Sequence, residues 1–260
     1  MTEINKKPYV SIITPNLNGE KFLEETIKSI VNQTSNNYEF ILIDGKSSDN
    51  SISIIKKYIN KINLFISEKD KSMYHAIDKG ISKASGEVII WINSDDILHK
   101  NAVRNVSNIF KKNPNIKWIS GINGYIKKNI RFSGIPYIYP RFILVKGYAN
   151  HAYWGFVQQE SVSFRKKLYD DVGGFDYKYN NSCDYGLWKK FSSVTSLHSV
   201  YLKIGFFRSW AGQDSKVNRI TTFKSIGMKK IPFYSFRFIR QLISLLILPY
   251  TLIKTYILTR

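Results

Sequence analysis

The sequence predicts an α/β fold with a mostly parallel sheet and helices on both of its faces. Two observations support this: short β-rich apolar runs alternate with helix-patterned segments in the first half of the chain, and the runs end in polar residues. The clearest run, VIIWI at 88–92, follows a glycine and is typical of a strand buried on both faces. The chain has 260 residues and 43% hydrophobic content, which suits one large domain or one domain plus an appendage.

The first half of the chain follows the order β-α-β-α-β-α-β. We expect strands over residues 9–14, 40–43, 63–67 and 88–92, and helices over 20–33, 51–58 and 72–84. Asn18 is a candidate cap for the first helix, and Gly80 in the third predicts close packing against a strand or a ligand. The turn after the first strand lacks the G-x-G-x-x-G pattern, which disfavours a dehydrogenase or a nucleotide-dependent methyltransferase.

The second half of the chain is less regular. We expect helices over 100–112, 165–172 and 182–191, and strands over 116–122, 157–164 and 201–208. Residues 126–150 are aromatic-rich and contain two prolines, so no element is assigned there. The aromatic side chains between Tyr137 and Trp154 suit either stacking on sugars or packing in the core.

Acidic residues follow two of the predicted strands. Asp95 and Asp96 come directly after the strand at 88–92, and Asp44 follows the strand at 40–43. In open α/β sheets, ligands bind at the carboxyl ends of the strands. Two adjacent carboxylates repel each other, and carboxylate oxygens suit Mg²⁺ or Mn²⁺ carrying a substrate phosphate. Each acid also has a structural alternative to ligand binding. Asp95 and Asp96 can start a loop and cap the next helix, and Asp44 can be a turn residue before Gly45.

The charge is strongly positive and unevenly distributed. The net charge is +20, and residues 216–260 contain nine Lys or Arg and no Asp or Glu. Such a balance suits nucleic acid, an anionic membrane or phosphorylated substrates, but no RNA-binding, helix-turn-helix or zinc-finger pattern is present. The single cysteine, Cys183, permits no internal disulfide, and residues 1–10 lack the apolar stretch of a signal peptide, so we expect a cytoplasmic protein.

Seven segments, in order, resemble family 2 glycosyltransferases of the GT-A fold. They are SIITPNLN, IDGKSSDNS, SEKDKSMYHAIDKGISKASGE, INSDD, QQESVSFRKKLYDDVGGFD, SCDYGLWKKF and FRSWAGQDS. The resemblance extends over about residues 9–215. Within the family, the chain resembles bacterial glycosyltransferases of cell-surface polysaccharide synthesis. Each segment alone is a loose match, but seven in the family's order are specific.

The resemblance implies roles for individual residues. It implies that Asp44 contacts the uracil or ribose, with Thr14, Pro15 and Asn16 beside it. Asp95 would contact the ribose and the shell around the metal, and Asp96 would bind Mn²⁺ or Mg²⁺ on the sugar diphosphate. Asp184 would be the general base that takes the proton from the acceptor hydroxyl.

The chain also departs from the family pattern at five positions. Close relatives usually carry Gly, Asp and Asn where this chain has Ser72, His75 and Asp78. Gly186 replaces an acidic residue, and Trp210 replaces a histidine that could assist the metal or the diphosphate. Because an indole cannot bind a cation, we expect Arg208 or a nearby lysine to contact the donor phosphate instead.

The chemistry fits an inverting glycosyltransferase. Displacing a nucleoside diphosphate requires stabilisation of negative charge, which a divalent ion supplies, and a base near the nucleophile. Asp184 at a helix N-terminus would stay ionised at neutral pH. One base and one metal imply single displacement with inversion. The alternatives are a degenerate nucleotide-sugar-binding module, a nucleotidyltransferase, which lacks its glycine-rich phosphate loop, and a nucleic-acid-binding protein, which the strand-end carboxylates disfavour.

The C-terminal segment is basic and apolar. We expect a glycosyltransferase domain at 1–215 and a helical membrane-associating segment at 216–260. Its longest uncharged run, residues 241–253, is interrupted by Pro249 and is short for a membrane-spanning helix. We therefore expect a protein that is peripheral on the cytoplasmic face of the membrane. Its expected partners are a nucleotide-sugar donor, a lipid-linked saccharide acceptor and an anionic membrane surface, and we expect no nucleic acid. A packed core helix is the alternative for the segment.

Overall fold

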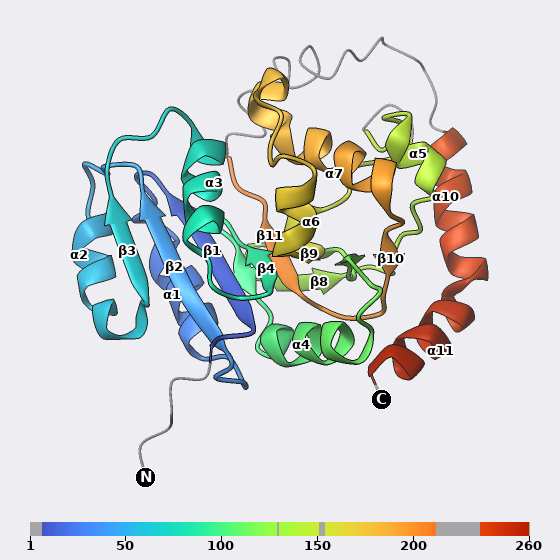
Figure 1. The fold of residues 1–260 in the computed structure, drawn as a ribbon, viewed down its shortest axis with the longest axis horizontal. Helices are drawn as coiled ribbons and strands as arrows, with labels where there is room; N and C mark the ends of the chain where they lie inside the picture. The colour runs from blue at the N-terminus through green and yellow to red at the C-terminus, as the bar shows by residue number, and fades with distance from the viewer. Residues whose placement is uncertain (1–6, 129, 151–153, 212–234, 260) are drawn as a thin grey trace.

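The central sheet has seven strands in the order β10-β6-β9-β4-β1-β2-β3 (Figure 1). We describe it from a computed structural model, which covers residues 7–128, 130–150, 154–211 and 235–259. Four neighbouring parallel strands come from the first half of the chain: β1 (Val10–Asn16), β2 (Tyr38–Asp44), β3 (Leu64–Ser67) and β4 (Val88–Trp91). The predicted α/β fold with a mostly parallel sheet is confirmed.

Of the remaining strands of this sheet, β9 runs opposite to all the others, and β6 and β10 return to the direction of β4. Strand β9 (Val162–Arg165) runs antiparallel to β4 and to β6 (Trp118–Ser120), and β10 (His198–Ser199) is parallel to β6. The strand predicted at 157–164 therefore begins later, at Val162, because a 3₁₀ turn, η2 (Gln159–Ser161), precedes it.

Helices cover both faces of the sheet, and each face has its own apolar core (Figure 1). On β1, Ile12 packs into one core and Ile13 into the other, as the alternation of side chains along a strand requires. One face carries α1 (Leu23–Val31), α2 (Ser51–Lys56) and α4 (Ala102–Lys112). The other carries α3 (Met73–Lys83), α6 (Lys166–Asp171) and α7 (Cys183–Val194). Gly80 of α3 packs on β1, where an added Cβ would lie 2.5 Å from Ile13.

A second sheet of four strands, β5-β11-β7-β8, lies beside the end of the first. It consists of β5 (Ile97–Leu98), β7 (Gly124–Lys127), β8 (Ile130–Ser133) and β11 (Gly205–Arg208). The strand predicted at 201–208 is thus shorter and belongs to this sheet. The aromatic-rich stretch also forms α5 (Arg141–Val145), which the sequence did not reveal because its elements are only four or five residues long.

Two local predictions about helix starts need correction. The first helix begins at Leu23 rather than near residue 20, and Asn18 does not cap it. Asn18 has a left-handed backbone (φ 51°), and its side-chain oxygen accepts the N–H of Ser48 at 2.8 Å, which joins the loops after β1 and β2.

The end of the chain forms α10 (Ser235–Leu246) and α11 (Leu248–Thr259). The predicted domain boundary between residues 215 and 216 lies outside the described residues.

Candidate active site

Polar side chains gather where β1 and β2 end side by side. Asn16 is the register partner of Asp44, and its Nδ2 donates to the Asp44 Oδ1 at 2.8 Å. The same carboxylate accepts the backbone N–H of Ser47 at 2.9 Å and the hydroxyls of Ser47 and Ser67 at 2.5 and 2.8 Å. Burial acts to raise the pKa of Asp44, but these hydrogen bonds outweigh it and hold the pKa below its ordinary value. Asp44 is therefore a fixed anion at the predicted nucleoside position.

The adjacent acids Asp95 and Asp96 lie in different surroundings. Asp96 is fully enclosed, and its Oδ1 accepts the backbone N–H of Arg208 at 2.7 Å. Asp95 is partly exposed, and its Oδ2 accepts the indole N–H of Trp210 at 2.9 Å. Burial raises the pKa of Asp95 above its ordinary value. The binding of the metal by Asp96 stays a prediction, but this geometry favours Asp95 as the carboxylate that a cation can reach.

Glu160 is a site residue that the sequence reading missed. It is buried beside Asp96, and burial raises its pKa to about 7. Burial and then the neighbouring Glu160 raise the pKa of Asp96 well above its ordinary value. Two buried carboxyl groups this close cannot both ionise without a cation. The charges of Asp95 and Asp184 also raise the pKa of Glu160, so both acids lie within electrostatic range of it.

A divalent cation fits this arrangement. The buried carboxyl groups of Asp96 and Glu160 interact with each other, and a cation would replace the proton that they share; Asp95 offers carboxylate oxygens next to Asp96 in the chain. In the part of the chain that the structure describes, no three His, Cys, Asp or Glu side chains form a complete metal cluster. Magnesium-like ions are commonly held by one or two carboxylates, with substrate phosphates supplying further ligands. The protein thus supplies part of the ligand set, and a diphosphate would complete it.

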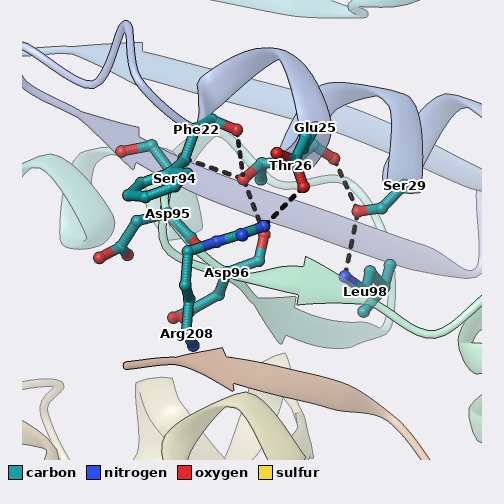
Figure 2. A network of polar contacts seen from close by, with 9 residues as sticks. All are labelled: Phe22, Glu25, Thr26, Ser29, Ser94, Asp95, Asp96, Leu98 and Arg208. Carbon is teal, nitrogen blue, oxygen red and sulfur yellow. Dashed lines mark hydrogen bonds and ion pairs between the residues drawn. The ribbon is translucent and has the colours of Figure 1, made fainter. Parts of the chain in front are cut away.

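Arg208 lies against the acidic loop, in contact with both Asp95 and Asp96. Its guanidinium is buried, donates from Nε to the carbonyl oxygen of Asp95 at 2.8 Å and pairs through Nη2 with Glu25 at 2.8 Å (Figure 2). It also stacks over the ring of Phe22, 4.4 Å from the centroid. These contacts hold Arg208 between the acidic loop and α1, and its contact with the donor phosphate stays a prediction.

Helix α1 holds the acidic loop through the hydroxyl groups of two residues. The hydroxyl of Thr26 lies 2.9 Å from the carbonyl oxygen of Ser94 and 2.7 Å from that of Asp96 (Figure 2). One turn later, the hydroxyl of Ser29 accepts the backbone N–H of Leu98 at 3.0 Å. From the sequence, Thr26 was simply one member of the buried face of a helix, because its partners are about seventy residues away.

Asp184, the predicted base, lies in the first turn of α7 and is partly exposed. Tyr74 of α3 donates its hydroxyl to the Asp184 Oδ1 at 3.1 Å. Desolvation of the carboxyl raises the pKa of Asp184, although the backbone N–H of Tyr185 and the hydroxyl of Tyr74 oppose the shift. A helix N-terminus alone would lower the pKa. The raised pKa makes Asp184 a stronger proton acceptor than an ordinary aspartate.

Three of the departures from the family pattern form one cluster on α3. Ser72 hydrogen-bonds His75 (2.8 Å between Oγ and Nδ1), and the His75 ring stacks on Tyr177 with 4.1 Å between centroids. Tyr177 in turn donates its hydroxyl to Asp78 at 2.9 Å. The fourth departure, Gly186, has a steric reason: an added Cβ would overlap the ring of Tyr179.

Comparison with known proteins gives relatives of one kind. An uncharacterized glycosyltransferase of Rickettsia felis is 29% identical over 208 residues, covering 76% of this chain but 34% of that protein. A dolichyl N-acetyl-alpha-D-glucosaminyl phosphate 3-beta-D-2,3-diacetamido-2,3-dideoxy-beta-D-glucuronosyltransferase of Methanococcus voltae is 27% identical over 195 residues, covering 66% of this chain and 60% of that one. The chain therefore spans about a third of the length of the first of these relatives.

Solved structures share the fold at low sequence identity. S. aureus TarS 1–349 in complex with UDP matches with a TM-score of 0.63 at 16% identity, covering 84% of this chain and 64% of that 1–349 chain. The mannosyltransferase PcManGT of Pyrobaculum calidifontis, in complex with GDP-Man and Mn²⁺, matches with a TM-score of 0.56 at 18% identity, covering 98% and 74%. Residues 11–170, well over half of the sequence, match the profile of glycosyl transferase family 2, and the chain belongs to this family.

Proposed function

We propose that the protein is a metal-dependent, inverting glycosyltransferase that moves a sugar from a nucleotide sugar to a hydroxyl of a lipid-linked saccharide. The pathway we propose is the synthesis of a surface polysaccharide, such as an O-antigen, a capsule or a lipooligosaccharide. The observation that carries this proposal is the position of the acids on one parallel sheet: Asp44 ends β2, and Asp95 and Asp96 follow β4, on either side of β1. A partly exposed acidic loop and a separate base at one site suit transfer from a diphosphate leaving group.

For the donor we propose a uridine diphosphate sugar. Asp44 is fully buried and four hydrogen bonds fill its acceptor positions, so it would fix Asn16 and Ser47 for contact with a ribosyl-uracil. Thr14 and Pro15 precede Asn16 on β1 and keep their proposed place beside the nucleoside. The TarS structure contains UDP, whereas the PcManGT structure contains GDP-Man, so the base is an experimental question.

For the metal we propose Mn²⁺ or Mg²⁺, held by the acidic loop. Asp95 would bind it directly, while the adjacent Asp96 is buried and fixes the loop by accepting the N–H of Arg208. When bound, the ion stabilises the charge that develops on the leaving diphosphate. Trp210 donates to Asp95 and would fix the direction of that carboxylate. PcManGT was solved with Mn²⁺, which supports a cation of this kind.

For the base we propose Asp184. Its carboxylate would accept the proton of the acceptor hydroxyl while that oxygen attacks the anomeric carbon from the face opposite the diphosphate. Tyr74 donates its hydroxyl to the Asp184 Oδ1 and would fix the direction of the carboxylate. In this scheme the acceptor oxygen is the only nucleophile and Asp184 the only base. The sugar is therefore displaced once, with inversion of the anomeric configuration.

The experiment is a nucleotide-sugar panel with the purified protein, Mn²⁺ and a lipid-linked saccharide, read by nucleotide release. The expected result is release with one donor only, dependent on the acceptor and abolished by chelation. Product configuration by NMR then tests inversion. Tight nucleotide-sugar binding without any acceptor-dependent release would favour a degenerate binding module, and full turnover in excess chelator would exclude the metal.

A further inference from the structure

The C-terminal helices α10 and α11 have their polar and apolar sides reversed relative to ordinary surface helices. Their buried polar residues point toward the rest of the molecule: Arg240, Ser244, Thr251 and Thr255. Their exposed side includes Phe238, Leu242, Leu246, Tyr250, Ile253 and Ile257, of which Leu246 is 71% exposed and Ile257 66%. A helix on a protein in water buries its apolar side and exposes its polar side. A contiguous apolar surface of this kind marks a site of interaction.

The inward polar side is used to attach the helix pair to the catalytic domain. The Arg240 guanidinium stacks on Tyr137, 3.7 Å from the ring centroid. In α11, the hydroxyl of Thr255 accepts the backbone N–H of Tyr201 at 2.7 Å. At the end of α11, Asn113 donates its Nδ2 to the carbonyl oxygen of Leu258 at 3.0 Å. The reversal is therefore built into the packing, and the apolar side is left facing outward by specific contacts.

These contacts also fix the direction of the pair. Arg240 holds its beginning and Asn113 of α4 holds its end, so both ends touch the same domain, along one edge of the molecule (Figure 1). Among the described residues, no single helix has the length and hydropathy needed to cross a membrane. Residues Phe238–Leu246 and Leu248–Thr259 meet that requirement only as a pair bent by 57°. A pair attached at both ends lies flat against the domain.

A second apolar group adjoins the beginning of the pair. The hydroxyl of Tyr139 interacts with Arg240, and α5 follows Tyr139 directly in the chain. Helix α5 and the residues after it expose Phe142, Val145 and Tyr148, with Phe142 62% exposed. Figure 1 shows α5 next to the upper end of α10.

We infer that the outward sides of α10, α11 and α5 form a membrane-docking face that enters one leaflet of an anionic bilayer without spanning it. The charge of the chain favours this occupant: residues 216–260 contain nine Lys or Arg and no acidic residue. An apolar helix face with flanking basic residues is the pattern of in-plane membrane helices. The contacts of Arg240 and Asn113 hold this face at a fixed orientation to the catalytic domain, so docking sets the direction from which a lipid-linked acceptor reaches the site.

Flotation of the full chain with vesicles tests the docking face directly and needs no donor or acceptor. The variant Leu246→Glu with Ile257→Glu changes two side chains that are mostly exposed, so the fold is expected to persist, as checked by circular dichroism. The matched control is Ile59→Glu with Asn60→Glu, which adds the same charge in η1 (Ile59–Lys61), at an exposed place far from the docking face. We expect binding to phosphatidylglycerol-containing vesicles to fall at least tenfold for the first variant and little for the control.

Two outcomes would overturn the inference. One is equal flotation of the docking-face variant and the control. The other is a dimer of the wild-type protein, by light scattering without lipid, that the docking-face variant abolishes, because a second copy would then cover the face. Orientation is tested with an environment-sensitive dye on Phe238→Cys or on Ile257→Cys, since Cys183 is buried. Quenchers placed in the outer leaflet should act equally on both positions; quenching at one end only would indicate a spanning segment.

Discussion

At the scale of single residues, Asp184 combines partial exposure with a raised pKa, as a base at neutral pH requires. We expect Asp184→Asn to leave donor affinity nearly unchanged and to lower kcat by roughly 10²–10⁴-fold, the usual contribution of a general base. Donor affinity is measured by calorimetry and kcat by nucleotide release. Loss of donor affinity with an unchanged kcat would instead make Asp184 a binding residue.

The hydrogen bond from Tyr74 to Asp184 predicts a shift in pH dependence. The Tyr74 hydroxyl favours the ionised carboxylate and lowers its pKa, so Tyr74→Phe should raise the pKa further. Activity requires the ionised base and is lost as the pH falls through this pKa. The acid limb of the kcat profile should therefore move to higher pH, by about one unit or less for one hydrogen bond. An unmoved limb with a lower plateau would show that Tyr74 acts only on packing.

The two adjacent acids predict different phenotypes because only one is accessible. Asp95→Asn should abolish Mn²⁺-dependent binding of the donor while leaving thermal stability close to that of the wild type. Asp96→Asn replaces a fully buried carboxyl that accepts the N–H of Arg208, so it should change the melting temperature as well. Metal-dependent donor binding is measured with and without chelator. If Asp96→Asn alone loses the metal, the original assignment to Asp96 is correct.

At the scale of elements, the contact between α1 and the acidic loop is the feature that orients the carboxylates. Thr26→Val keeps the shape of the side chain but removes the hydroxyl that lies against the carbonyls of Ser94 and Asp96. We expect a loss of about 1–3 kcal/mol in the free energy of unfolding, the usual cost of leaving buried polar groups unpaired. We also expect weaker Mn²⁺-dependent donor binding. Thr26→Ser, which retains the hydroxyl, is the matched control and should preserve both properties.

A loss of stability in Thr26→Val without any change in metal-dependent binding would limit α1 to a structural role. Arg208 belongs to the same contact, since it joins the carbonyl of Asp95 to Glu25 on α1. The acidic loop is thus held from two sides, by the hydroxyl of Thr26 and by the guanidinium of Arg208 (Figure 2).

At the scale of the whole molecule, the C-terminal helices are part of the folded unit. Contacts at both ends of the pair, through Arg240 and Asn113, join them to the catalytic domain. We expect a single urea transition in which the far-UV signal and a dye at Ile257→Cys change together, because coincident probes mark one cooperative unit. A dye transition at lower urea than the far-UV transition would show that the pair unfolds independently.

The sequence by itself determined the architecture and the place of the site. Alternating apolar runs and helix patterns require a mostly parallel sheet, and the carboxyl ends of parallel strands meet at one edge. Asn16, Asp44 and the Asp95–Asp96 pair therefore had to lie near one another, whatever the details of packing. The family motifs extended this to Asp184, which lies on a helix from the other half of the chain.

Only the tertiary structure decided which side chains face the ligand and which are held inside. The N–H of Arg208 reaches Asp96 across 112 positions, and Thr26 reaches Ser94 across 68, distances at which local patterns carry no information. The same holds for Glu160, which became a site residue through its neighbours. In α10 and α11, the sequence showed a basic and apolar segment, but the contacts of Arg240 and Thr255 determined that the polar side is buried and the apolar side faces outward.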